Sequence, residues 1–186
     1  DVIKIASTKP YGFRRFFPGP GVGGHCIPVD PNYLYWKSVK VGLPAKFIKL
    51  SAQTNLTVLN FIIKKILKNL KIQKLPLNKS KILILGLSYK KNLDDIRESA
   101  SIKIINKLLA KGIKNISAYD PYTIHKILTK KIHKIKSLTP KVIKNFDIVV
   151  LMTDHDLFDY DLIENNAKLI IDCRGRLEVK NNVQRG

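Results

Sequence analysis

The order of apolar and polar positions divides the chain into a helical first part and a second part in which strands and helices alternate. Between residues 47 and 70, apolar side chains recur three or four positions apart, which is the spacing of one helix face. Pro44 suits the first turn of a helix, and the pattern predicts about 26 helical residues, roughly 39 Å at 1.5 Å per residue. Because apolar residues cover more than one stripe, we expect this helix to pack on two sides.

A second, shorter helix is predicted before it, over residues 32–41. It would bury Leu34, Tyr35 and Val39 and end at Gly42. Residues 1–16 form an apolar and basic lead-in with no predicted element. Residues 71–80 are polar and contain a proline, which is typical of a linker. We therefore expect a domain boundary there, with a helical segment at residues 1–75 and a second domain at residues 76–186.

The second domain alternates short apolar runs with amphipathic stretches. The predicted strands are residues 81–87, 115–119, 132–135, 147–152 and 169–172, and the predicted helices are residues 99–111, 124–128, 140–145 and 161–165. This alternation predicts an α/β fold with a doubly wound parallel sheet. Ligands of such sheets bind beyond the carboxyl ends of the strands, where this chain carries polar residues at 88–91, 120–122, 153–155 and 173–175.

The first of these turns lacks a dinucleotide signature. Gly86 is followed by Leu87, Ser88 and Tyr89, so the Gly-x-Gly-x-x-Gly pattern is absent. We therefore do not expect this domain to hold NAD in the usual way.

The net charge of +20 raises the question of a nucleic-acid or membrane partner. The lysines are scattered along the whole chain, without interleaved aromatic residues and without a known nucleic-acid-binding signature. We expect neither partner, although a positive field favours an anionic substrate. No apolar run reaches the ~18 residues of a membrane span, and the first residues lack a signal-peptide pattern, so we expect a cytoplasmic protein. The two cysteines form no disulfide framework, and no metal site is expected.

Residues 17–31 carry the most specific chemistry in the chain. Glycines permit positive φ and close approach of a ligand to the backbone, while prolines stiffen the loop. A cysteine alone is most often a small buried side chain, and a glycine and proline cluster is usually a turn. Together they favour a functional loop whose N–H groups bind a sugar or phosphate and which presents Cys26 at its end.

The sequence of residues 19–31, GPGVGGHCIPVDP, resembles the active-site segment of the nucleotide-sugar 6-dehydrogenases. Residues 9–13 and the His-Cys-Ile-Pro form are most similar to the branch that acts on UDP-N-acetylhexosamines. Further matches at residues 82–99, 119–121, 153–156 and 172–175 resemble that family's Rossmann-like, UDP-binding C-terminal domain. The resemblance implies the C-terminal portion of an NAD-dependent enzyme that oxidises the C6 alcohol of a UDP-sugar to the acid, for polysaccharide precursors.

The resemblance also implies roles for individual residues. Cys26 would be the nucleophile that forms a thiohemiacetal and then a thioester, and Asp30 would orient or deprotonate water. An N-cap for a helix after Pro31 is the alternative role for Asp30. The side chain of His25 should point away from that of Cys26. The residues expected to bind substrate are Phe17, Pro18, Gly19, Pro20, Gly21, Val22, Gly23, Tyr89, Lys90 and Arg174.

Three assignments stay open on the sequence. Arg97 matches a residue that reaches the cofactor pyrophosphate, but an ion pair with Asp94 or Asp95 is the alternative. Arg176 competes with Arg174 for the substrate. Cys173 is expected to be structural.

The resemblance finally implies partners and limits. NAD would be held mainly by an upstream domain, so we expect no turnover by this chain alone. A homodimer would form through the long helix at residues 44–70, and the alternative is that this helix packs within the core of its own chain. UDP-N-acetylglucosamine is the leading substrate, with UDP-glucose and UDP-N-acetylmannosamine as the alternative substrates. The alternative to an enzyme is a non-catalytic UDP-sugar-binding or dimerisation module.

Overall fold

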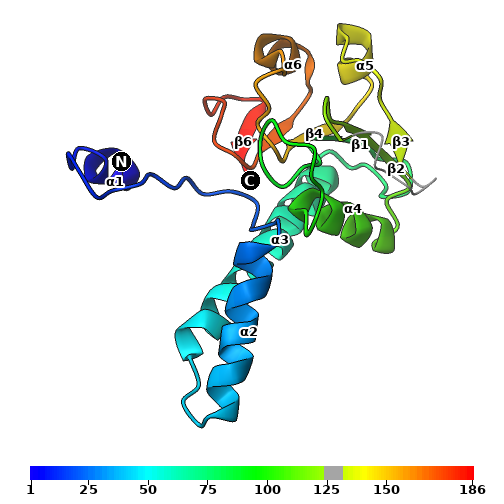
Figure 1. The fold of residues 1–186 in the computed structure, drawn as a ribbon. Helices are drawn as coiled ribbons and strands as arrows, with labels where there is room; N and C mark the ends of the chain where they lie inside the picture. The colour runs from blue at the N-terminus through cyan, green and yellow to red at the C-terminus, as the bar shows by residue number, and fades with distance from the viewer. Residues whose placement is uncertain (124–131) are drawn as a thin grey trace.

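The computed structural model describes residues 1–123 and 132–186, in which a helical arm extends from an α/β domain (Figure 1). The helix predicted at residues 124–128 lies outside the described residues. The arm is an antiparallel pair of helices, α2 (Cys26–Lys40) and α3 (Lys46–Ile72). A short helix, α1 (Val2–Ala6), lies apart from both within the predicted lead-in.

Helix α3 matches the predicted long helix, whereas α2 corrects the prediction. It begins at Cys26 rather than at residue 32, because Pro31 lies inside the helix instead of marking its start. Pro28 lies in the first turn, where a backbone N–H has no hydrogen-bond partner within the helix. Pro31 lies further in, so its missing N–H costs the helix one backbone hydrogen bond. Burial of Leu34 and Val39 was also predicted wrongly, since they are 60% and 48% exposed.

The α/β domain is built on one parallel sheet of six strands in the order β3-β2-β1-β4-β5-β6. The strands are β1 (Lys81–Leu85), β2 (Asn115–Tyr119), β3 (His133–Lys134), β4 (Ile148–Leu151), β5 (Ile170–Asp172) and β6 (Val183–Arg185). This doubly wound order confirms the predicted fold class. Strand β6 was not predicted, because its three residues carry little apolar signal.

Helices cover both faces of the sheet (Figure 1). Helices α3 and α4 (Ala100–Ala110) close one face, and their buried side chains share a core with Ile82 and Ile84 of β1. Helices α5 (Pro140–Lys144) and α6 (Tyr160–Asn166) close the other face over Leu83 and Leu85. The alternation of β1 side chains between two faces explains why this strand reads as a continuous apolar run.

Helix α3 belongs to both parts of the molecule. Its second half is buried in the α/β core at Leu59, Ile62, Ile63, Ile66 and Leu70. Its first half lies in the arm, where Phe47, Leu50 and Leu56 are more than half exposed. The expected boundary at residue 75 falls in the connection between α3 and β1, but the core of the second domain includes half of the helix before it.

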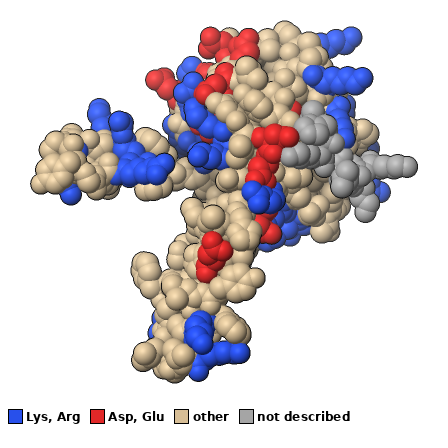
Figure 2. Space-filling view, viewed as in Figure 1, with Lys and Arg blue, Asp and Glu red and all other residues tan. Residues whose placement is uncertain are grey.

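The charge of the chain is spread over its surface. Figure 2 shows lysine and arginine side chains around α1, at the free end of the α2–α3 pair and across the α/β domain, and not as one continuous stripe on this face. Among the described residues, no helix is both long and apolar enough to cross a membrane.

Helix α3 offers a direct test of this packing. Ile66→Ala should lower the free energy of unfolding by about 2–5 kcal/mol, because Ile66 is fully buried under the sheet and truncation leaves a cavity. The same change at Ile72, which is 66% exposed on the same helix, should cost no more than about 0.5 kcal/mol. Urea unfolding followed by circular dichroism measures both, and equal losses would mean that α3 does not pack as described.

Candidate functional site

Residues 17–25, which precede α2, form the glycine loop. A cavity of about 410 Å³ lies between this loop and the carboxyl edge of the sheet. Its walls come from the loop, from the turn after β1, from the start of α4 and from the residues after β4 and β5. The lining residues are Phe17, Pro20, Gly21, Gly23, Ser88, Tyr89, Lys90, Lys91, Ala100, Ser101, Met152, Thr153, Asp154 and Arg174. The fold thus brings together most of the residues that the sequence assigned to substrate, from segments up to 157 positions apart.

The glycine loop is seated directly on the connection between β1 and α4. The N–H of Gly24 donates to the Arg97 carbonyl oxygen at 2.9 Å, and Gly24 adopts a φ of +83°. A Cβ on Gly23 would lie 2.5 Å from the Cβ of Tyr89 and 3.1 Å from the Glu98 carbonyl oxygen. Any side chain at Gly23 would therefore separate the loop from the sheet edge.

Arg174 occupies the opposite wall of the cavity. Its backbone N–H donates to Asp172, and its Nε donates to the Asp154 carboxylate at 2.8 Å. The guanidinium also approaches Gly19 so closely that a Cβ there would collide with it. Arg176 instead stacks over the Tyr160 ring at 4.8 Å. Of the two arginines between which the sequence could not choose, Arg174 is the one that lines the cavity.

The third wall of the cavity carries positive charge. The exposed side chain of Lys90 lies beside the first residues of α4, an 11-residue helix whose N-terminal N–H groups carry partial positive charge. Ser99 and Ser101 donate to the carbonyl oxygens of Leu87 and Gly86, which fixes the start of α4 against the turn. Lys90, Arg174 and the helix N-terminus together fit a phosphate group.

The turn after β1 does not fit a dinucleotide. A Cβ on Gly86 would collide with Thr153, so the glycine serves packing of the turn against the segment after β4. Asp120, at the position where a Rossmann domain presents an acid to ribose, is fully buried and accepts the N–H groups of Leu87 and Ser88. The carboxylate is therefore already engaged within the protein, and NAD is not accommodated here in the Rossmann manner.

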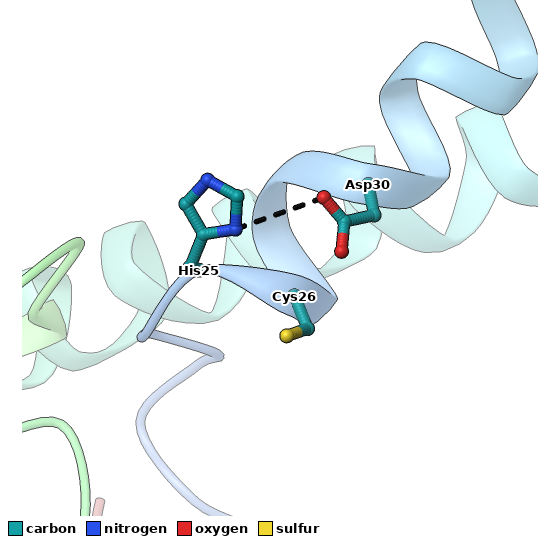
Figure 3. Close-up of side chains that lie close together, drawn as sticks. All are labelled: His25, Cys26 and Asp30. Carbon is teal, nitrogen blue, oxygen red and sulfur yellow. Dashed lines mark ion pairs between the residues drawn. The ribbon is translucent and has the colours of Figure 1, made fainter.

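A second group of side chains surrounds the first turn of α2 (Figure 3). The Nδ1 of His25 lies 3.7 Å from the Oδ1 of Asp30, and one ligand atom from each of His25, Cys26 and Asp30 lies within 4.8 Å of the others. In Figure 3 the ring of His25 and the thiol of Cys26 extend from opposite sides of the ribbon, as expected, although one ring nitrogen lies within 4.8 Å of the Sγ. Helix α2 begins at Cys26. Positions 26 and 30 then share one helix face, with residue 25 at its end. For the same reason Asp30 is not a helix cap.

This group is exposed and chemically versatile. A thiol, an imidazole and a carboxylate can act on a carbonyl or hold a thiophilic metal. The absence of a metal in this chain stays a prediction.

Arg97 and Tyr89 lie between the cavity and this group. The carbonyl of Arg97 holds Gly24, two residues before Cys26, and its guanidinium pairs with Asp95 at 2.6 Å. The hydrogen bond and the charge of Asp95 raise the pKa of Arg97, with a smaller contribution from Cys26. The ion pair considered as the alternative role of Arg97 is thus present.

Comparison with protein families identifies the chain. Residues 83–179 match the UDP-binding domain of the UDP-glucose/GDP-mannose dehydrogenase family, and residues 1–57 match the central domain of the same family. The chain belongs to this family. The matched regions contain the glycine loop, the Cys26 group and every strand from β2 to β5, which confirms the resemblance drawn from the motifs.

Individual members of the dehydrogenase family resemble the chain over nearly its whole length. The UDP-N-acetyl-D-mannosamine dehydrogenase of Methanococcus maripaludis is 36% identical over 96% of this chain and 40% of the relative. The NDP-N-acetyl-D-galactosaminuronic acid dehydrogenase of Ralstonia solanacearum is 30% identical over 97% of this chain and 41% of the relative. The structure of the UDP-D-ManNAc dehydrogenase from Pyrococcus horikoshii superposes with a TM-score of 0.76 at 28% identity, over 96% of this chain and 41% of that one. The chain therefore spans about 40% of the length of these relatives.

The sequence did not predict every residue that lines the cavity. Asp154 and Ser101 line the cavity but were not selected, although both follow predicted strand ends or helix starts. The buried contact between Asp120 and His155 was also missed. These two residues lie 35 positions apart, and their only sequence signal is that each follows a strand.

The two cysteines of the chain should differ sharply in reactivity. Burial raises the pKa of the Cys173 thiol to about 12, so at pH 8 only about one part in ten thousand is thiolate. Cys26 is exposed. Iodoacetamide labelling at pH 8, followed by mass spectrometry, should modify Cys26 at least about tenfold faster than Cys173.

Cys26→Ser is the control for this labelling and should remove the fast phase alone. Equal labelling of both thiols in the folded wild type would contradict the burial of Cys173.

Proposed function

We propose that this chain forms the substrate-binding and nucleophile-bearing part of an NAD-dependent dehydrogenase that oxidises C6 of a UDP-sugar to the acid. The observation that carries the proposal is the cavity itself. It joins a wall formed by Lys90, Arg174 and the α4 N-terminus, which carries positive charge, to a bare backbone loop that ends at Cys26.

The cavity suggests how the substrate is divided among these walls. Lys90 and Arg174 would bind the diphosphate, where charge-assisted hydrogen bonds are strongest. The backbone of residues 17–23 would clasp the sugar and the nucleotide, with Tyr89 beside them. This places the sugar at the end of the loop nearest to Cys26, which follows Gly23 by three residues.

Cys26 would act as the nucleophile of the second oxidation. Its Sγ adds to the C6 aldehyde and forms a thiohemiacetal, and water later releases the acid from a thioester. Asp30 would orient or deprotonate that water, and His25, 3.7 Å away, would hold Asp30 in place. The chemistry that NAD would supply is the uptake of two hydrides, one per NAD molecule, from the C6 alcohol and then from the thiohemiacetal as it becomes the thioester. Because a dinucleotide does not fit the turn after β1, we propose that NAD is held mainly outside residues 76–186, with Arg97 as the residue of this domain that reaches its pyrophosphate.

The substrate class is a UDP-N-acetylhexosamine. UDP-N-acetylglucosamine was the leading expectation from the motifs, whereas the names of the Methanococcus and Pyrococcus relatives specify N-acetylmannosamine. We therefore place UDP-N-acetylmannosamine first and UDP-N-acetylglucosamine second.

Calorimetric titration of UDP and the two UDP-N-acetylhexosamines into the chain tests the proposal. Lys90→Ala and Arg174→Ala should each weaken binding of UDP at least about tenfold, because each removes a charged hydrogen bond worth about 1.5–3 kcal/mol. Lys111→Ala is the matched control, since Lys111 follows α4 at its other end and should leave affinity unchanged. Equal binding by all four proteins would refute the assignment of the cavity.

We also propose that the chain forms a homodimer through the arm. Apolar side chains are exposed along both of its helices, among them Trp36 at 55%, Leu50 at 58% and Phe61 at 58%. Many large apolar side chains exposed on one part of a molecule are typical of a protein interface. A partner there would provide the second packing side that the apolar pattern of the long helix requires.

Analytical ultracentrifugation should therefore give twice the chain mass of 21.2 kDa. Leu50→Glu should raise the dimer dissociation constant about tenfold or more, since burying a leucine contributes about 1.5–3 kcal/mol. Leu157→Glu alters a similarly exposed leucine of the α/β domain and should leave association unchanged. A monomeric wild type would eliminate the dimer.

A further inference from the structure

A buried polar cluster behind the turn after β1 has no part in the proposed chemistry. His155 and Asp120 are both 0% exposed, and the Nε2 of His155 lies 3.0 Å from the Oδ2 of Asp120. Ser88 completes the cluster, with its Oγ 3.2 Å from the same ring nitrogen. Buried titratable groups are costly unless they are fully hydrogen-bonded, so this arrangement needs a reason.

The hydrogen bonds define the protonation of the His155 ring. The backbone N–H of Asn92 donates to Nδ1 at 2.9 Å, so Nδ1 carries a lone pair and no proton. The ring proton therefore lies on Nε2, which donates to Asp120. The hydroxyl of Ser88 donates to the Lys90 carbonyl at 2.8 Å and can accept from Nε2 as well. His155 is thus a neutral imidazole whose two nitrogens have opposite roles.

One side of the ring is anchored in the core. Besides His155, Asp120 accepts the N–H groups of Leu87 and Ser88 at one oxygen and those of Tyr122 and Thr123 at the other. Burial acts to raise the pKa of Asp120, but these donors outweigh it and keep the carboxylate ionised. Asp120 therefore connects the end of β2 to the end of β1.

The other side of the ring holds the loop that carries Lys90. Asn92 has a φ of +57°, a left-handed conformation that asparagine adopts more readily than most residues. Its side chain and Lys91 are further tied to Asp156, next to His155 in the chain. The segment 89–91 is thus clamped at both ends, by Ser88 and by Asn92, and both clamps contact the same imidazole.

We propose that His155 is a positioning residue for substrate binding, which aims the segment 89–91 into the cavity by bridging Asp120 to the backbone of Asn92. The proposal rests on the assignment of Lys90 to the UDP diphosphate. It predicts that the contact of His155 with Asn92 determines the affinity for UDP, whereas its contact with Asp120 contributes to the free energy of unfolding.

Two substitutions separate these contacts. Each supplies a polar atom at the position of one ring nitrogen and leaves the position of the other without one. His155→Asn retains an acceptor at the position of Nδ1 and loses the donor to Asp120. His155→Gln retains a donor at the position of Nε2 and loses the acceptor for Asn92. The glutamine variant should bind UDP about tenfold or more weakly, and the asparagine variant within about threefold of wild type, although both are destabilised.

A core variant on the far face supplies the control for stability. Ile143→Val truncates a fully buried side chain of α5, away from the cavity, and should lower stability without changing UDP affinity. Affinities that follow the free energy of unfolding across all three variants would reduce His155 to a structural role and overturn the proposal. Unchanged UDP affinity in the glutamine variant would overturn it too.

Nuclear magnetic resonance tests the clamp independently of any ligand. Long-range ¹H–¹⁵N correlation should show the proton of His155 on Nε2, and the Asn92 amide should exchange slowly with solvent in wild type and in His155→Asn. Exchange should be at least about tenfold faster in His155→Gln, beyond any change seen in Ile143→Val. If wild type binds no UDP, the function proposed for Lys90 fails, but these two signals still support or refute the clamp; a proton on Nδ1 refutes it.

Discussion

The carboxylate of Asp120 holds together the place where the chain's functional segments meet. It lies in the core, yet it remains charged because five protein donors point at its two oxygens. Through them the ends of β1 and β2 and the segment after β4 are fixed in one arrangement. An acid in this position of a Rossmann-type sheet normally faces a ribose, and here it has become part of the protein's own framework. The cavity consequently opens above the turn, toward Lys90 and Arg174.

The glycine loop depends on that framework. Gly23 lies against the Cβ of Tyr89, and Gly24 donates to the backbone of Arg97, so the loop follows any movement of the segment between β1 and α4. Cys26 comes directly after these contacts, at the first residue of α2. The position of the nucleophile is therefore coupled, through backbone contacts, to the wall that would hold the phosphates. Helix α3 adds a second coupling, because its buried half supports the sheet while its exposed half belongs to the arm.

Much of the fold was predictable because its local signals agree. The strand over residues 115–119 and the long helix occur where periodicity placed them, and glycines or polar turns mark their ends. The prediction failed at α2, where the helix was expected to start at residue 32, after Pro31, whereas Pro31 lies inside it. A proline removes one backbone hydrogen bond from a helix but does not always end it. That error also placed Asp30 before the helix. Strand β6 was missed because three residues carry too little pattern.

By itself, the sequence determined the fold class, the family and the residue types available for chemistry. It could do so because glycine, proline and apolar periodicity act over a few positions, and because the motifs keep a recognisable order. Only the tertiary structure decided which of these residues face one cavity, that Arg174 rather than Arg176 lines it, and that Asp120 serves the core instead of a ligand. Such choices depend on contacts between segments 20 to 120 positions apart, such as Arg174 with Asp154 and Lys65 with the carbonyl of Arg185. The packing of strands and helices brings these partners together, and no local pattern in the sequence records it.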